Sequence, residues 1–123
     1  NLILKKIKNS KKWNNQFNFI IPSKDIDPSW MGLPILIDKK FKKIKSTFVD
    51  ILDQAGIETR PIISGSFVNQ PAVKLYKLNK NNEKFYEAQK AQDLGFLIGL
   101  HTNKISGKQL NLIHDTFFKI DTL

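Results

Sequence analysis

Arginine occurs once in this chain, at Arg60, whereas lysine occurs nineteen times. A guanidinium group binds carboxylate or phosphate oxygens through two parallel hydrogen bonds, whereas a lysine offers a single point charge. The lone arginine therefore indicates either a contact with an anionic ligand or a structural pair with a nearby carboxylate such as Glu58. From the side chain alone the structural role is favoured, because structural ion pairs are common.

The residues that follow Arg60 could extend a site for an anion. Ser64, Gly65 and Ser66 carry backbone amides and hydroxyl groups of the kind that form a phosphate nest. A single glycine is a weak signal for such a nest, and serines beside a glycine more often shape a turn. The serines lack the G-x-S-x-G frame of a nucleophile between a strand and a helix, so we expect no serine hydrolase.

The two histidines do not form a metal-binding pattern. His101 and His114 lie thirteen residues apart, and the chain contains no cysteine. Zinc sites need several such ligands at short, regular spacings, so we expect no metal site. His101 directly follows an apolar strand and could reach a ligand at the edge of the sheet, although a hydrogen-bonded structural histidine is commoner. His114 is expected on the surface.

Hydrophobic periodicity predicts an α+β fold with helices on one face of a small sheet. Four helices are expected near residues 1–13, 44–55, 83–94 and 106–120, and three short strands near residues 33–38, 57–59 and 96–99, with one further helical turn at 72–76. Ser106 and Gln109 form a capping box that begins the last helix, and Gly56 ends the second helix in a left-handed conformation.

Several single residues carry further expectations for these elements. Pro34 cannot donate to a ladder, so its strand is expected at an edge of the sheet, or Pro34 at a strand start. Trp30 is expected to cover the core, and Phe85 is expected to face inward from the third helix. A break in regular structure is expected at residues 79–82.

Length and composition indicate one domain. With 123 residues and 41% hydrophobic residues, the chain can bury a single core. We expect residues 1–22 to form a connecting helix and linker and residues 23–123 to form the α+β core. The absence of cysteine permits a reducing compartment, so the expected location is the cytoplasm. No apolar run approaches the roughly twenty residues of a membrane-spanning helix. A first residue other than Met suits a fragment of a longer protein.

Positive charge is concentrated in the first third of the chain. The net charge is +9, and residues 1–45 contribute +8 of it, from eleven lysines and three aspartates. A basic surface can bind nucleic acid or an acidic partner, which leaves an independent binding module as the alternative function. Simple lysine pairs without arginine or stacking aromatics more often form a solvated face, so nucleic acid is the disfavoured partner.

Four segments together resemble a known family. They read SWMGLPI at residues 29–35, AGIETRP at 55–61, GSFVNQP at 65–71 and GFLIGLH at 95–101. In order and spacing they resemble the small carboxy-terminal domain of the DegT/DnrJ/EryC1/StrS sugar aminotransferases, over nearly the whole chain from about Asn9. The likeness is greatest to the lipopolysaccharide-sugar 3-dehydratase branch, from which the chain departs at Ser66, Asn69 and Leu100, where that branch has Asn, Arg and Asn.

The resemblance implies the carboxy-terminal domain of a fold type I enzyme dependent on pyridoxal or pyridoxamine phosphate. This domain would contain a mostly antiparallel sheet of about three strands packed against helices. The parent enzyme would act on a nucleotide-linked 4-keto sugar, by amino transfer or C-3 dehydration, in polysaccharide or O-antigen biosynthesis. It would be a homodimer, and its large amino-terminal domain would hold the cofactor and the catalytic residue. The present chain alone would then be inactive and bind no cofactor.

The resemblance also implies a wall that this domain presents to the active-site cleft of the parent. Arg60 would contact an anionic group of a substrate, and the loop that follows Arg60 would line the sugar pocket. The expected substrate-binding residues are Arg60, Gly65, Ser66, Phe67, Asn69, Gln70 and His101. No catalytic residue is expected in this chain. The alternative remains that Arg60 only ties the loop to Glu58 or to an aspartate of the large domain.

Overall fold

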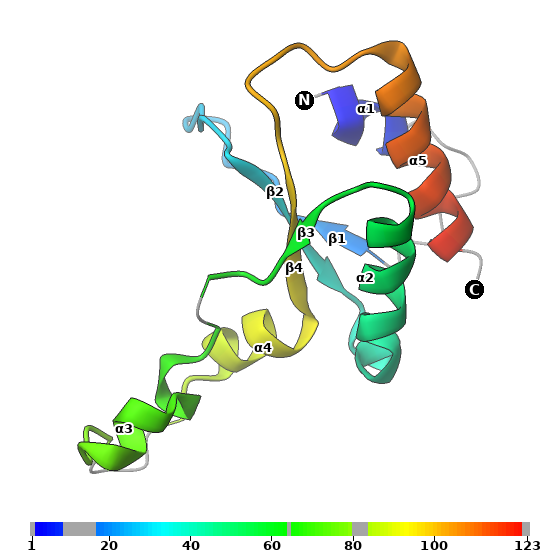
Figure 1. Cartoon of the computed structure of the whole chain (residues 1–123). Coiled ribbons are helices and arrows are strands. Elements are labelled where there is room, and N and C mark those ends of the chain that lie inside the picture. The colour runs from blue at the N-terminus through cyan, green and yellow to red at the C-terminus, as the bar shows by residue number, and fades with distance from the viewer. Residues whose placement is uncertain (1, 9–16, 64, 80–83, 122–123) are drawn as a thin grey trace.

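The computed structural model describes residues 2–8, 17–63, 65–79 and 84–121 (Figure 1). Four antiparallel strands form one sheet in the order β1-β2-β4-β3. They are β1 (Phe17–Phe19), β2 (Gly32–Ile37), β3 (Thr59–Arg60) and β4 (Gly95–Gly99). The predicted α+β class and antiparallel sheet are confirmed, with four strands instead of about three.

Helices lie on one side of the sheet and extend beyond one end of it. The longer ones are α1 (Leu2–Lys8), α2 (Lys45–Gln54), α4 (Tyr86–Leu94) and α5 (Gly107–Asp121), and the short ones are η1 (Lys39–Ile44), η2 (Phe67–Asn69) and α3 (Pro71–Leu75). Helices α1, α2 and α5 lie beside the sheet. Helices α3 and α4 form an extension away from it, with α3 at the tip (Figure 1).

Strand β1 was not predicted from the sequence. It pairs with β2 from Phe17 opposite Ile37 to Phe19 opposite Ile35. Three residues are too few to show an alternating pattern, and Phe17 alone of the three is buried. The segment expected as a helix and linker therefore also contributes an edge strand.

Both expectations for Pro34 were wrong, because β2 lies between β1 and β4 and begins at Gly32, two residues before Pro34. Pro34 directs its carbonyl toward the β1 side, where it accepts from the amide of Ile20 at 3.4 Å. Ile20 lies just past the end of β1. The missing amide hydrogen of Pro34 thus falls where the β1 ladder stops, and a proline is tolerated there.

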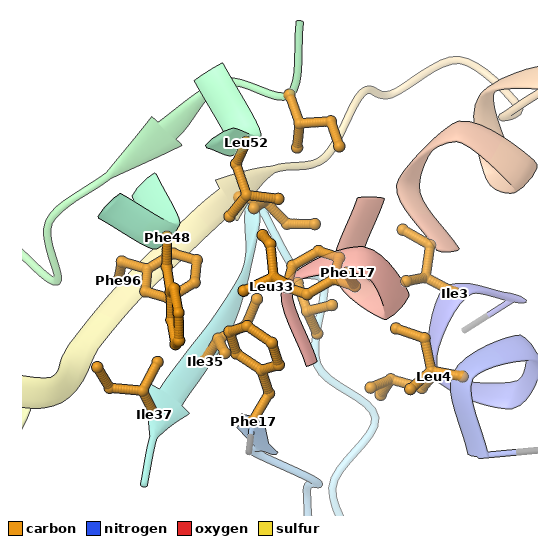
Figure 2. Close-up of a cluster of buried hydrophobic side chains, with 14 of the residues drawn as sticks. Ile3, Leu4, Phe17, Leu33, Ile35, Ile37, Phe48, Leu52, Phe96 and Phe117 are labelled. Atoms are coloured by element: carbon orange, nitrogen blue, oxygen red, sulfur yellow. The ribbon is translucent and has the colours of Figure 1, made fainter. Parts of the chain in front are cut away.

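The hydrophobic core lies between the sheet and its helices (Figure 2). Phe17 is at its centre, with ring centroids 5.6 Å from Phe48, 6.4 Å from Phe96 and 5.1 Å from Phe117. The last two rings meet Phe17 edge to face, the arrangement that aromatic pairs favour. Residues from four elements therefore meet in one core, which fixes the sheet against α2 and α5.

Two predicted helix boundary signals were correct, one at the end of α2 and one at the start of α5. Gly56, two residues after α2, has a φ of 77°, and the amide of Ser106 donates to Oε1 of Gln109 at 2.9 Å. The amide of Gln109 donates back to Oγ of Ser106 at 3.2 Å, which completes the capping box. Phe85, in contrast, is exposed, because α4 begins only at Tyr86.

Other expectations have mixed outcomes. Trp30, two residues before β2, is half-buried, but its neighbour Met31 is 89% exposed. Residues 9–13 of the first predicted helix and most of the predicted break at 79–82 lie outside the described residues.

Within the described part, no helix is long and apolar enough to cross a membrane. The same residues contain no group of three metal-ligating side chains.

Candidate functional site

Arg60 lies on the face of the sheet that the helices leave uncovered. It pairs directly with Leu97, and Leu97 pairs with Pro34 on the next strand. Paired residues point to the same side of a sheet, and side chains alternate along a strand. Phe96 and Ile98, on either side of Leu97, are buried in the core. The row of Arg60, Leu97 and Pro34 therefore points away from the core.

The guanidinium group of Arg60 is paired with Glu58. Its Nε and Nη2 atoms donate to the same carboxylate oxygen, Oε1, at 2.9 and 2.5 Å. The two side chains are 69% and 67% exposed. An ion pair so accessible to water stabilises a fold by at most about 1 kcal/mol. The structural pair that the sequence offered as an alternative is thus present, and its exposure leaves Arg60 accessible to an anion.

The loop after Arg60 is held by Gln92 of α4. Oε1 of Gln92 accepts from the backbone amide of Ser66 at 3.0 Å and from Nδ2 of Asn69 at 3.2 Å. Gly65 has a φ of 63°, and a Cβ atom there would lie 2.9 Å from the Gln92 side chain. Gly65 therefore allows the loop to pack directly on α4.

Ser66 is buried, at 1% exposure, and its Oγ has no hydrogen-bond partner in the described part of the chain. Its amide is already used by Gln92, so the described atoms form no open phosphate nest. Ser64 lies outside the described residues. Ser66 therefore holds the loop in place through its buried position and through the bond from its amide to Gln92.

Phe67, Asn69 and Gln70 lie in and just after η2. Phe67 is 59% exposed, and Asn69 also donates from Nδ2 to Oε1 of Gln89 at 2.7 Å. Beside them opens a pocket of about 340 Å³. It is lined by Ser66, Val68, Asn69, Asn79, Lys84, Phe85, Tyr86 and Gln89. Ser66, Val68 and Asn69 of the loop thus border a hollow whose walls carry amides, a lysine and two aromatic rings.

His101 lies far from this loop. The loop leaves the sheet near the start of β4, where a Cβ atom on Gly95 would lie 2.5 Å from Cδ1 of Ile62. His101 follows the other end of β4, two residues beyond Gly99, and is exposed. Strand β4 alone spans roughly 14 Å. The structure brings Gly65, Ser66, Asn69 and the neighbouring loop residues together. It places Arg60 on β3 opposite Leu97, the middle residue of β4, and leaves His101 beyond the far end of β4.

Two lysines of the basic first third brace α4. Nζ of Lys42 is 2.6 Å from Oδ2 of Asp93, and Nζ of Lys45 donates to the backbone oxygen of Gln92 at 2.9 Å. The hydrogen bond from Lys42 holds the pKa of Asp93 below its usual value, and burial lowers the pKa of Lys45. Part of the basic segment therefore has a structural task, which is to fix the helix that carries Gln92.

The residues that support the loop were missed by the sequence analysis. Gln89, Gln92 and Asp93 lie on one helix, and Gln89 donates from Nε2 to Oδ1 of Asp93 at 2.9 Å. Polar residues on a surface helix give no signal in a single sequence, because most of them only contact water. Their role follows from the path of the loop across α4.

No protein-family model matches this chain. Among curated proteins, GDP-4-keto-6-deoxy-D-mannose 3-dehydratase of Escherichia coli O55:H7 (strain CB9615 / EPEC) is 31% identical over 75 residues. The match covers 61% of this chain and 19% of that protein. The chain is therefore homologous to a small part of that enzyme, and the likeness expected from the motifs is confirmed.

Solved structures of the same kind of enzyme share the fold. A mutant GDP-4-keto-6-deoxymannose-3-dehydratase with bound GDP-perosamine gives a TM-score of 0.69 at 23% identity. E. coli GDP-4-keto-6-deoxy-D-mannose-3-dehydratase with bound hydrated PLP gives 0.68 at 23% identity. Each match covers 94% of this chain but only 28% of the other, so the chain spans less than a third of these proteins.

Proposed function

We propose that this chain is the small carboxy-terminal domain of an enzyme, dependent on pyridoxal or pyridoxamine phosphate, that modifies a nucleotide-linked 4-keto sugar. The observation that carries the proposal is the sequence match to GDP-4-keto-6-deoxy-D-mannose 3-dehydratase, which coincides with a shared fold over 94% of the chain. The reaction would be C-3 dehydration or amino transfer. The parent would be a cytoplasmic homodimer in polysaccharide or O-antigen biosynthesis.

Lys45 is not placed to form a Schiff base with the cofactor. A lysine that forms a Schiff base needs a free amine that faces the substrate. Lys45 has a lowered pKa, but its Nζ is bonded to the backbone of Gln92 in support of α4. The proposal therefore places the cofactor and its chemistry on a large domain that precedes this one.

The role proposed for this domain is to bind and orient the substrate. Arg60 is exposed on the open face of the sheet, where it would bind an anionic group of the nucleotide sugar. That group would either replace Glu58 as the partner of the guanidinium or share the guanidinium with Glu58. Phe67, Asn69 and Gln70 would line the sugar side of the cleft. Gly65 and Ser66 would hold that loop against α4, and His101 would contact a part of the substrate beyond the other end of β4.

The full-length protein tests the proposed function. Its reading frame should encode roughly 250 residues before this chain, in alternating strands and helices. The purified protein should bind pyridoxal phosphate, seen by its absorbance, and should convert GDP-4-keto-6-deoxy-D-mannose, or a sugar with another nucleotide, into a deoxygenated or aminated product seen by mass spectrometry. A protein that binds no such cofactor would contradict the proposal.

Replacing Arg60 tests the substrate contact. In the full-length enzyme, Arg60→Ala should raise KM for the nucleotide sugar by roughly tenfold or more, because a charge-assisted hydrogen bond contributes about 1.5–3 kcal/mol. Arg60→Lys should recover part of this loss, since it restores the charge but not the fork.

Glu58→Gln is the matched control for Arg60. It breaks the same ion pair but leaves the guanidinium group free, so KM should stay near the wild-type value or fall. Equal changes in KM for Arg60→Ala and Glu58→Gln would instead assign Arg60 a purely structural role. Stability should change by less than about 1 kcal/mol in both variants, as measured by urea unfolding.

A further inference from the structure

A continuous chain of side-chain hydrogen bonds leads from η1 to Asn69 in η2. Nζ of Lys42 lies 2.6 Å from Oδ2 of Asp93, and Oδ1 of Asp93 accepts from Nε2 of Gln89 at 2.9 Å. Oε1 of Gln89 in turn accepts from Nδ2 of Asn69 at 2.7 Å. Oε1 of Gln92 accepts from the same Nδ2 at 3.2 Å. The two hydrogens of this amide nitrogen are therefore both used inside the domain.

The direction of these bonds is set by groups that can act in only one way. A lysine ammonium only donates, and an ionised carboxylate only accepts. Asp93 is ionised at neutral pH, since the hydrogen bond from Lys42 holds its pKa below its usual value. Gln89 must therefore turn Nε2 to Asp93 and Oε1 to Asn69. Asn69 can meet that oxygen only with Nδ2.

The backbone amide of Ser66 sets the same orientation independently. It donates to Oε1 of Gln92 at 3.0 Å, so Gln92 also turns its carbonyl oxygen to the loop. Since both neighbours present acceptors, Oδ1 of Asn69 is turned away from them, and in the described part of the chain no residue donates to it. Asn69 is exposed and lines the pocket of about 340 Å³. Its side chain therefore offers a ligand an acceptor and no donor.

We infer that Asn69 is a specificity-determining residue that accepts a hydrogen bond from a hydroxyl group of the sugar, and that Gln89 is its positioning residue. The inference rests on the proposed function. In a nucleotide-linked 4-keto-6-deoxy sugar the keto and phosphate oxygens only accept, whereas the hydroxyl groups at C-2 and C-3 can donate. An amide whose donors are both used cannot bind the first two groups. Asn69 thus selects a sugar with a donor at this place and leaves the anionic group to Arg60.

Fluorinated substrate analogues test the inference in the full-length protein. Fluorine replaces a hydroxyl group with little change in size but cannot donate a hydrogen bond. Calorimetry gives the dissociation constants of GDP-4-keto-6-deoxy-D-mannose and of its analogues with fluorine at C-2 or C-3. One analogue should bind the wild type about fivefold more weakly than the parent sugar, the size of one neutral hydrogen bond. Asn69→Ala should bind that analogue and the parent sugar equally. Asn111→Ala, at an exposed asparagine of α5, is the matched control and should discriminate as the wild type does.

Two substitutions on α4 test the positioning role of Gln89. In Asp93→Asn, the new amide turns its oxygen to Lys42, which only donates, and its nitrogen to Gln89. Gln89 then presents Oε1 to the new amide and Nε2 to Asn69, which places two donors against each other. Discrimination between the parent sugar and the fluorinated analogue should fall from about fivefold to about twofold or less. Adding Gln89→Glu should restore it, because a carboxylate accepts from both neighbours and the charge of the pair is again that of the wild type.

Three results would overturn the inference. If the wild type does not discriminate, or Asn69→Ala weakens the parent sugar and both analogues equally, its oxygen meets no hydroxyl group of the sugar, and the proposed function stays intact. If Gln89→Glu does not restore discrimination in a folded Asp93→Asn protein, Gln89 has no positioning role. If the wild type does not bind this sugar on GDP or on another nucleoside diphosphate, the proposed function fails and the inference with it, so the two failures are distinguishable. Circular dichroism establishes that each variant is folded.

Discussion

Phe117→Ala should destabilise the domain by about 3–5 kcal/mol, the largest loss that we expect from one substitution. The ring of Phe117 is fully buried and lies 5.1 Å from Phe17 and 5.9 Å from Phe19 between ring centroids. Removing it leaves a cavity where α5 meets β1 (Figure 2). The surrounding rings cannot fill this space without leaving the edge-to-face contacts that hold the edge strand.

Phe118→Ala is the matched control, one residue along the same helix. Phe118 is half-buried and stacks on His114, with ring centroids 6.1 Å apart and an interplanar angle of 13°. Its removal should cost about 1 kcal/mol, the usual size for a partly exposed side chain. The free energy of unfolding in urea measures both variants. Equal losses would mean that α5 does not use the face through Phe117 to close the core.

The elements predicted correctly from the sequence are those in which burial repeats along the chain. Phe48 and Leu52 in α2, and Phe117 and Ile120 in α5, are spaced for one helical face, and all four are fully buried. Strand β1 was missed because three residues show no period. Its existence depends on a pairing with β2, which is a long-range contact that no local pattern reports.

The candidate site was predictable only where short motifs carry it. The segments around Arg60 and Gly65 pointed to the correct relatives, and the Arg60–Glu58 pair joins two residues that lie two positions apart, with Glu58 just before β3. The supporting role of Gln92 could not be predicted, because it depends on how the loop crosses α4. The separation of His101 from the loop likewise follows from the antiparallel register of β3 and β4, which motifs do not encode.

Gly95 shows how one position links the stability of the fold to the candidate site. It follows α4 directly and begins β4, with an extended backbone of φ −92°. The requirement for glycine is therefore one of space. A Cβ atom there would lie 2.4 Å from the backbone oxygen of Ala91 and 2.5 Å from Cδ1 of Ile62.

Gly95→Ala should therefore destabilise the domain by about 1–3 kcal/mol, the usual cost of overpacking, because the carbonyl of Ala91 belongs to the helix and cannot move freely. The added methyl group then fits only if the side chain of Ile62 moves, and Ile62 lies two residues after Arg60. The substitution should then also weaken nucleotide-sugar binding by the full-length enzyme, although Gly95 itself is buried.

Gly107→Ala separates this steric effect from the general effect of adding a methyl group. No atom lies within 4 Å of a Cβ built on Gly107, which is the first residue of α5. Alanine there should leave stability unchanged or raise it by up to about 1 kcal/mol, because glycine is the poorer helix former. The free energy of unfolding in urea should fall for Gly95→Ala and stay level or rise for Gly107→Ala. This difference would place the strain of Gly95→Ala at its contacts with Ala91 and Ile62. A neutral Gly95→Ala would mean that the link between α4 and β4 can open without cost, and that Ile62 does not fix the path of the chain after Arg60.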